Sequence, residues 1–180
     1  RRGHDPVLYF VYTGHGSFTD DGPPFLAMHG DDHLDSDRLE DLVLESLPTR
    51  FTHIIVDACH AGAVVGARGA FFDEEVDAET KDLSDRQADS LLQGKRLDDH
   101  PNVGLLLSST AGEASHEWSA IESGVFTHEV LSALRGAADI NRDRRIEYSE
   151  IDAFVAAANR RIEDERARPT VVSHPPKSNP

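Results

Sequence analysis

Three short apolar runs constrain the fold of this chain more than any other feature. They are residues 7–12 (VLYFVY), 53–58 (HIIVDA) and 103–108 (VGLLLS). Each contains β-branched or aromatic residues and is bounded by turn residues, which is typical of strands buried on both faces of a parallel sheet. A fourth run, residues 170–173, is weaker and is expected at an edge.

Three segments with apolar residues at helical spacing accompany these strands. The first has Ser36 as its predicted N-cap and ends at Pro48, the second spans residues 126–134 with Gly136 beyond it, and the third starts near Ser149. The order strand, helix, strand, strand, helix, helix predicts an α/β fold with a mostly parallel sheet flanked by helices. The expected apolar stripes are Leu39, Leu42, Val43 and Leu47 in the first helix, Phe126, Val130, Leu131 and Leu134 in the second, and Ile151, Phe154, Val155, Ala158 and Ile162 in the third.

Length and charge narrow the class of protein. The chain has 180 residues, enough for one domain with a real core, and its 33 acidic against 18 basic residues give a net charge of −15. This charge repels phosphate, so we expect neither nucleic acid nor a membrane surface as a partner. No apolar run is long enough to span a membrane, and a cytoplasmic location is the default expectation.

Two acidic segments do not have the pattern of a core. Residues 19–45 hold nine acids and one base, and residues 61–99 hold ten acids and five bases. The second is longer than an ordinary connection inside a compact domain. We therefore interpret residues 1–180 as one domain with a linker-like insertion at 61–100 and an extended tail at 169–180.

The chemistry-bearing residues follow two of the predicted strands. The first strand leads into Gly14-His15-Gly16, and the second leads into the only cysteine, Cys59. Because the carboxyl ends of parallel strands meet at one edge of a sheet, we expect His15 and Cys59 to share that edge. A thiol and an imidazole in this arrangement are a nucleophile and its base, and the backbone N–H groups of Gly16 and Cys59 are the natural donors to an oxyanion.

Each residue alone has a plainer interpretation. A free cysteine is most often buried and inert, and a histidine in a turn often makes one backbone hydrogen bond. His60 competes for the role of base, but it directly follows the nucleophile and we rank it below His15.

These motifs resemble the caspase-like cysteine peptidases, and most closely the metacaspases, paracaspases and prokaryotic caspase homologues. The histidine lies 44 residues before Cys59, against roughly 50 in caspases. The segments LLLSSTAGEASHEW and SGVFTHEVLSALRG resemble the strand and helix that follow in this family, so the resemblance covers most of residues 7–160. It implies a cysteine endopeptidase with a His15–Cys59 dyad, an oxyanion hole at Gly16 and Cys59, and proteins or peptides as substrates.

The resemblance also implies a substrate preference. An aspartate two residues before the cysteine, here Asp57, occupies the pocket floor in the relatives that cleave after Arg or Lys. A carboxylate binds these cations through charge-assisted hydrogen bonds. We expect a second acid from Glu117, with Glu113 as the alternative. The plainer interpretation is that Asp57 caps nearby amides and that the glutamates are solvated.

Two differences from the family concern the ends of the domain and its linker. Family members carry a strand–helix–strand–helix unit before the histidine strand, and this sequence lacks it. We therefore expect an upstream part of the same protein. Cleavage near Arg1-Arg2, or a boundary chosen for expression, would explain why the sequence starts where it does. The caspase linker is cut during maturation, and proteolytic activation is expected here too. The insertion offers basic residues for such cuts at Arg68, Lys81, Arg86, Lys95 and Arg96.

Residues 139–150 (DINRDRRIEYSE) fit a Ca²⁺-binding loop pattern, except that Arg144 replaces a glycine. The plainer interpretation is an acidic turn between helices, with Asp139 and Ser149 as caps. A weaker candidate for a Ca²⁺ site is the acidic run at residues 73–77. The peptidase chemistry itself requires no cofactor. The Ca²⁺ ligands would be Asp139, Asn141, Asp143, the Arg145 carbonyl, Glu147 and Glu150.

A second class of function stays open at this stage. A non-catalytic regulatory or Ca²⁺-responsive module could keep the same fold. The presence of His15, Gly16 and Cys59 together favours the peptidase, because a module without catalysis has no chemical need for all three.

Overall fold

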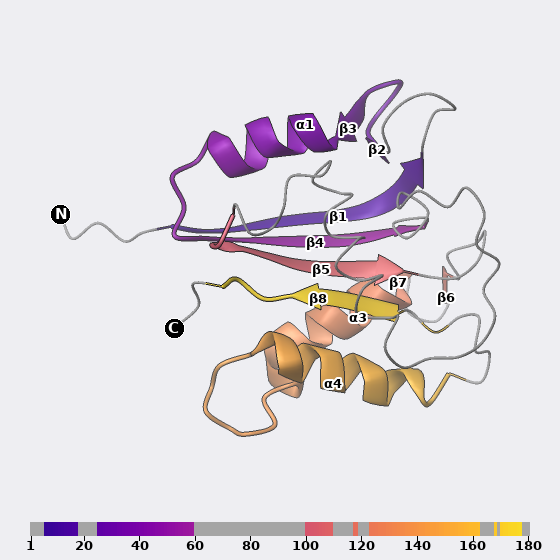
Figure 1. Cartoon of the computed structure of the whole chain (residues 1–180). Coiled ribbons are helices and arrows are strands. Elements are labelled where there is room, and N and C mark those ends of the chain that lie inside the picture. Colours follow the sequence, from indigo (N-terminus) through magenta and orange to yellow (C-terminus); the bar gives the residue numbers. More distant parts are fainter. Residues whose placement is uncertain are drawn as a thin grey trace, which may run out of the picture.

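The computed structural model describes residues 6–17, 25–59, 100–109, 117–118, 123–162, 168 and 170–177. At Ser17, Ser36, Cys59, Ser109, Glu117, Trp118, Ser123 and Thr170 it describes the backbone only. These residues form an α/β fold with a six-stranded sheet in the order β3-β2-β1-β4-β5-β8 (Figure 1), as predicted. The strands are β1 (Val7–Ser17), β2 (Phe25–Ala27), β3 (His33–Asp35), β4 (Phe51–Cys59), β5 (Val103–Ser109) and β8 (Thr170–His174).

The centre of the sheet is parallel. Strand β1 pairs with β4 from Val7↔Phe51 to His15↔Cys59 without an interruption, and β4 pairs with β5 in the same direction. Strand β8 is antiparallel and lies at the edge beyond β5, as expected for the weak fourth run. The short strands β2 and β3 form the other edge and were not predicted, because three residues each are too few to give a pattern.

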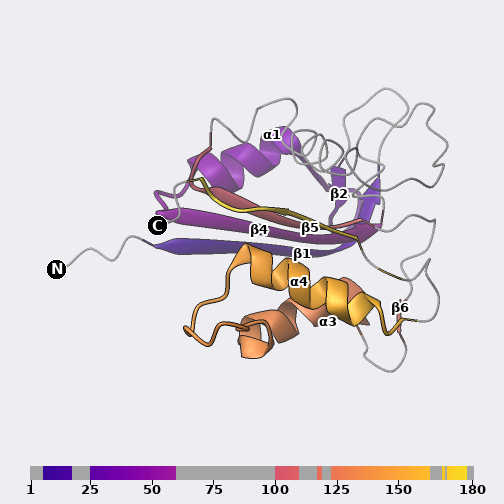
Figure 2. The same ribbon diagram turned by 60° about the horizontal axis from the view of Figure 1, so that its bottom comes forward.

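Helices cover both faces of the sheet (Figure 2). Helix α1 (Ser36–Leu39) and its π-helical continuation η1 (Glu40–Glu45) lie on one face. Helix α3 (Val125–Ser132), its π-helical continuation η3 (Ala133–Ala137) and helix α4 (Tyr148–Asn159) lie on the other. A small hairpin of β6 (Glu117–Trp118) and β7 (Ser123–Gly124) directly precedes α3.

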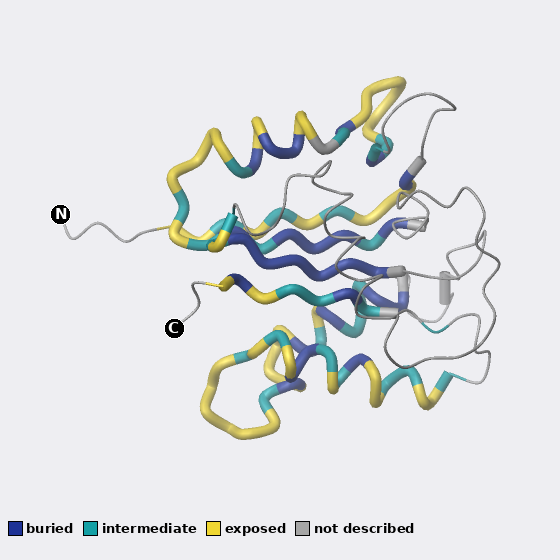
Figure 3. Tube along the Cα trace, viewed as in Figure 1, coloured by how far each residue is buried: buried dark blue, intermediate teal, exposed yellow. Residues whose placement is uncertain are grey.

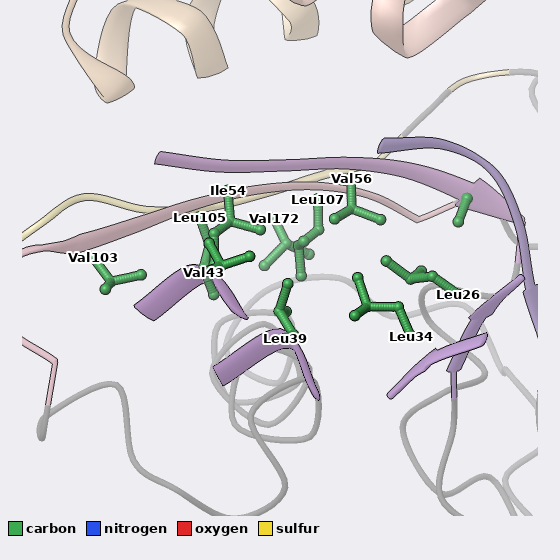
Figure 4. Close-up of a cluster of buried hydrophobic side chains, with 11 residues drawn as sticks. Leu26, Leu34, Leu39, Val43, Ile54, Val56, Val103, Leu105, Leu107 and Val172 are labelled. Atoms are coloured by element: carbon green, nitrogen blue, oxygen red, sulfur yellow. The ribbon is translucent and has the colours of Figure 1, made fainter. Parts of the chain in front are cut away.

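The core on the α1 face includes residues from the acidic segment 19–45. Leu26, Leu34, Leu39 and Val43 are all buried there against Ile54 and other residues of the central strands (Figure 4). The prediction that this segment lies outside the core was therefore wrong. Most of its described acids are exposed, namely Asp31, Asp32, Asp37, Asp41 and Glu45, whereas Glu40 is buried. The short strands and the helix need only a few apolar residues on their inner sides.

The core on the α3–α4 face centres on Phe126, which is 1% exposed and packs with Ile55, Leu106 and Ile151. Figure 3 shows β4 and β5 as the most continuously buried strands, whereas β1 is only partly buried. Val7, Tyr9 and Val11 are 45%, 57% and 59% exposed. The prediction that all three central strands are buried on both faces was thus wrong for β1, because no described element packs over these three side chains.

The first helix differs from its prediction at both ends. Asp35, not Ser36, caps it, because the Asp35 carboxylate accepts a 2.9 Å hydrogen bond from the Arg38 N–H. The π-helical turns of η1 change the angular spacing of the side chains, and Leu42 is exposed rather than buried. The π-helix ends at Glu45, so Leu47 lies beyond it and is exposed as well.

The later helices keep their predicted positions with shifted limits. Leu131 and Leu134 are exposed, because Phe126 and Val130 already fill the contact with the sheet. Helix α4 is capped by Glu147 in a reciprocal capping box with Glu150, not by Ser149. It ends at Asn159, so Ile162 lies beyond it.

Candidate active site

His15 and Cys59 are register partners in the parallel ladder between β1 and β4. Their backbones therefore lie next to each other, about 5 Å apart as in any sheet, at the edge where β1, β4 and β5 end (Figure 1). The His15 side chain is exposed at this edge. The side chain of Cys59 is outside the described part, so the thiol–imidazole contact stays a prediction.

Tyr12 supports the backbone of the histidine motif. Its hydroxyl lies 2.9 Å from the carbonyl oxygen of His15 and 2.7 Å from that of Ala27 in β2. Burial raises the pKa of Tyr12, so the phenol keeps its proton. Its O–H donates a hydrogen bond that the two carbonyl oxygens share. A Cβ on Gly14 would lie 2.7 Å from the same hydroxyl, which explains a glycine there. Sequence reasoning missed Tyr12, whose only signal was this glycine two residues later.

Gly16 is buried at the point where β1 leaves β4. The ladder with β4 ends at His15, and Gly16 pairs instead with Leu26 of β2. Figure 1 shows β1 curving away from β4 over this stretch. The role of the Gly16 and Cys59 amides as oxyanion donors stays a prediction.

Asp57 lies between Thr13 of β1 and Ser108 of β5 in the sheet register. Its Oδ2 accepts two hydrogen bonds from Thr127, one from the backbone N–H at 3.1 Å and one from the hydroxyl at 2.5 Å. Thr127 is the third residue of α3, so Asp57 caps the positive end of that helix. The plainer interpretation of Asp57 is therefore confirmed, and it leaves the pocket role open because a carboxylate has two oxygens.

The candidate second acids fall in different places. Glu117 pairs with Gly124 in the β6–β7 hairpin, and Gly124 directly precedes the first residue of α3. Its backbone is thus joined to the end of α3 that contacts Asp57, although its side chain is outside the described part. Glu113, His60, the acidic run 73–77 and the basic residues of the insertion also lie outside the described residues.

A second polar cluster lies at the opposite end of the strands. His53 Nδ1 is 2.7 Å from the hydroxyl of Tyr148, and the ring of Tyr9 stacks on His53 with centroids 4.9 Å apart. Burial lowers the pKa of His53 and raises the pKa of Tyr148, so both groups favour their neutral forms. Cys59 lies six residues further along β4, about 20 Å away, so this cluster does not belong to the site.

The loop at residues 139–150 is organised by its own carboxylates. Asp139 accepts hydrogen bonds from the N–H groups of Asp143 and Arg144, both at 3.1 Å. Glu150, which is buried, accepts bonds from Ile140 at 3.1 Å and from Glu147 at 3.1 Å. The predicted turn between helices is confirmed, but Asp139 caps amides within the loop rather than a helix end, and Ser149 does not act as a cap.

Arg142 and Arg144 in this loop have φ values of 61° and 66°, which are left-handed and strained for residues with a Cβ. Among the described residues, no three His, Cys, Asp or Glu side chains are grouped so that they could hold a metal ion. Binding of Ca²⁺ to the backbone and side-chain oxygens of this loop stays a prediction.

Comparison with known families decides the relationship. The model of the caspase domain, a peptidase family, matches residues 1–179. The chain belongs to the caspase-domain peptidases. The α/β sheet described above is the fold expected for a caspase domain, and cysteine peptidase activity on protein substrates is the activity of this family. No curated protein and no solved structure matched the chain. No helix in the described ranges of this caspase domain is long and apolar enough to cross a membrane.

Proposed function

We propose that this caspase-domain protein is a cysteine endopeptidase that uses Cys59 as nucleophile and His15 as base. The observation that carries the proposal is the register pairing of these two residues at the carboxyl edge of the sheet. By the two-residue period of a strand, positions 57 and 59 belong to the same face of β4, so a pocket at Asp57 would adjoin the nucleophile.

The reaction would proceed through a thioester. His15 takes the thiol proton of Cys59, and the thiolate sulfur attacks the carbonyl carbon of the scissile peptide. The oxygen becomes an oxyanion that the N–H groups of Gly16 and Cys59 would stabilise. The C–N bond then breaks as the imidazolium of His15 gives its proton to the leaving amine. Water, deprotonated by His15, hydrolyses the thioester and returns the thiol.

The proposal includes cleavage after Arg or Lys. Asp57 would bind the basic side chain, and the hairpin that carries Glu117 is connected directly to the helix end at Asp57, which favours Glu117 over Glu113 as the second acid. A carboxylate pair rejects acidic side chains by like-charge repulsion.

Activation by processing is part of the same proposal. The insertion at residues 61–100 carries arginines and lysines that match the proposed specificity, so the enzyme could cut its own linker. This segment is outside the described residues. Incubation of the wild type and Cys59→Ala should then produce fragments in the wild type only.

The decisive experiment compares peptide substrates. The native full-length protein is incubated with fluorogenic peptides ending in Arg, Lys or Asp, alongside Cys59→Ala and His15→Ala. We expect turnover of the Arg and Lys peptides by the wild type, and a loss of at least about 1,000-fold in both variants. Equal turnover by Cys59→Ala would refute Cys59 as the nucleophile, and no turnover by any protein would favour the non-catalytic module. Turnover of Asp peptides alone would refute the pocket.

A further inference from the structure

Asp57 is held on one side only. The two hydrogen bonds that it accepts, from the N–H and the hydroxyl of Thr127, converge on Oδ2. Within the described part of the chain, Oδ1 receives no hydrogen bond. Among the described residues, one oxygen of this carboxylate is therefore fixed by the protein and the other accepts no hydrogen bond.

This arrangement determines the direction of the open oxygen. A carboxylate at a strand end can rotate about its last torsion, which has a broad energy profile. Two donors on Oδ2 from a single residue of a packed helix remove that freedom. The helix is itself anchored, because Phe126, the neighbour of Thr127, is 1% exposed in the core. Oδ1 is thus oriented before any substrate arrives, which lowers the entropy cost of binding.

The geometry also limits how a cation can be bound. With two donors already on Oδ2, Asp57 can offer a substrate only Oδ1, so it would make one hydrogen bond rather than a two-pronged contact. Either cation would then need further acceptors, because a guanidinium has five N–H donors and an ammonium has three.

We propose that Thr127 is a positioning residue for substrate specificity: it holds Asp57 so that Oδ1 faces the basic side chain of the substrate. The inference rests on the proposed function, since it assigns Asp57 to the pocket. It adds a residue that never touches the substrate and acts only through Asp57. Its hydroxyl is the part that can be removed, because the backbone N–H bond remains in any variant.

The test uses Thr127→Val, which keeps the shape but not the hydroxyl, and Thr127→Ser, which keeps the hydroxyl. Leu131→Ala on the exposed side of the same helix is the control for a general disturbance of α3. We measure kcat and KM for the Arg and Lys peptides, with the melting temperature of each protein. Thr127→Val should raise KM about 5- to 10-fold with kcat within about twofold. This is less than the roughly 10- to 150-fold cost of one lost hydrogen bond to a charged group, because the backbone N–H of Thr127 still holds Asp57. Thr127→Ser should restore KM, and Leu131→Ala should match the wild type.

A double variant separates positioning from structure. If Thr127 acts through Asp57, Thr127→Val should have no further effect on KM in an Asp57→Asn background. Equal effects of Thr127→Val and Thr127→Ser on KM, or an unchanged KM in Thr127→Val, would overturn this inference. Cleavage of the Arg and Lys peptides by the wild type would still support the proposed function in that case. If the wild type does not cleave Arg or Lys peptides, both the proposed specificity and the inference about Thr127 are refuted. Should Thr127→Val fail to fold, Thr127→Ala takes its place in the same comparison.

Discussion

His15 lies directly beside Cys59 at the end of nine consecutive parallel pairs between β1 and β4. A slip of one residue would place His15 opposite Ala58 and turn every side chain of β1 to the other face. Leu8, Phe10 and other partly buried residues of β1 pack on the α1-side core, and this packing opposes such a slip. The register of the core thus controls the distance between the two residues to which we assign the chemistry.

Gly14→Ala should reduce activity by disturbing this edge. The new Cβ would lie 2.7 Å from the Tyr12 hydroxyl, so the ring or the backbone before His15 must move. A small displacement of a catalytic group costs on the order of 10- to 100-fold in kcat/KM. The measurement is kcat/KM for the Arg peptide. Tyr12→Phe in the same chain removes the hydroxyl that the Cβ meets, so the double variant should lose less activity than the product of the two single losses. Independent losses would contradict this mechanism.

The parts of the fold that were predictable have strong, regular patterns. The runs at 53–58 and 103–108 are buried between two layers of helices, so nearly every position is apolar and the strands stand out. The edge position of β8 also follows from its weak pattern. The exposed face of β1 could not be foreseen, because Val7, Tyr9 and Val11 have the composition of core residues and exposure depends on what packs over them.

The candidate site was predictable to a similar extent. His15 and Cys59 each lie next to a glycine or a strand end, and parallel strands bring such ends together. The contact between Asp57 and Thr127 joins residues 70 positions apart, and no local pattern indicates it. The cap at Asp35 was missed because Ser36, an equally good capping residue, stands beside it.

Arg144→Gly should raise the stability of the protein. Arg144 has φ at 66°, which costs roughly 1 kcal/mol for a residue with a Cβ and nothing for glycine. Glycine loses more entropy on folding, so we expect a net gain of about 0.5 kcal/mol in the free energy of unfolding. Urea unfolding in the presence of a chelator measures it. Arg145→Gly, at a position without positive φ in the same loop, is the control and should bring no gain.

The same variants test the Ca²⁺ prediction. Ca²⁺-binding loops carry glycine at this position, so Arg144→Gly should bind the ion at least as well as the wild type. If the loop binds Ca²⁺, the ion should raise the melting temperature of the wild type and Arg144→Gly, and Glu150→Gln should remove the effect. Identical melting curves with Ca²⁺ and with chelator for the wild type and Arg144→Gly would show that the loop is only a turn.

Asp152→Asn should stabilise the protein at neutral pH. The Oδ2 of Asp152 accepts a 2.6 Å hydrogen bond from Ser173, whereas its buried Oδ1 has no partner in the part of the chain that the structure describes. Burial raises the pKa of this carboxyl above its ordinary 3.8. The folded state therefore holds the proton more tightly than the unfolded state. The free energy of unfolding falls as pH rises from 3.8 through the higher pKa of the folded state. The uncharged amide removes this loss, so the melting temperature at pH 7 should rise and its pH dependence above pH 4 should weaken. A lower melting temperature at pH 7 would contradict the prediction.

His53→Asn should make the protein lose less stability in mild acid than the wild type does. Burial lowers the pKa of His53 below its ordinary 6.5, so below pH 6.5 the unfolded state binds more protons than the folded state. The free energy of unfolding therefore falls as pH drops from 6.5 through the folded-state pKa. Asparagine offers an oxygen near Nδ1 for the Tyr148 hydroxyl and does not titrate, so its stability should fall less between pH 7 and pH 5 in urea unfolding. His29→Asn, at an exposed position, is the control and should keep the wild-type slope. If His53→Asn kept that slope as well, the acid sensitivity would have to arise from other groups.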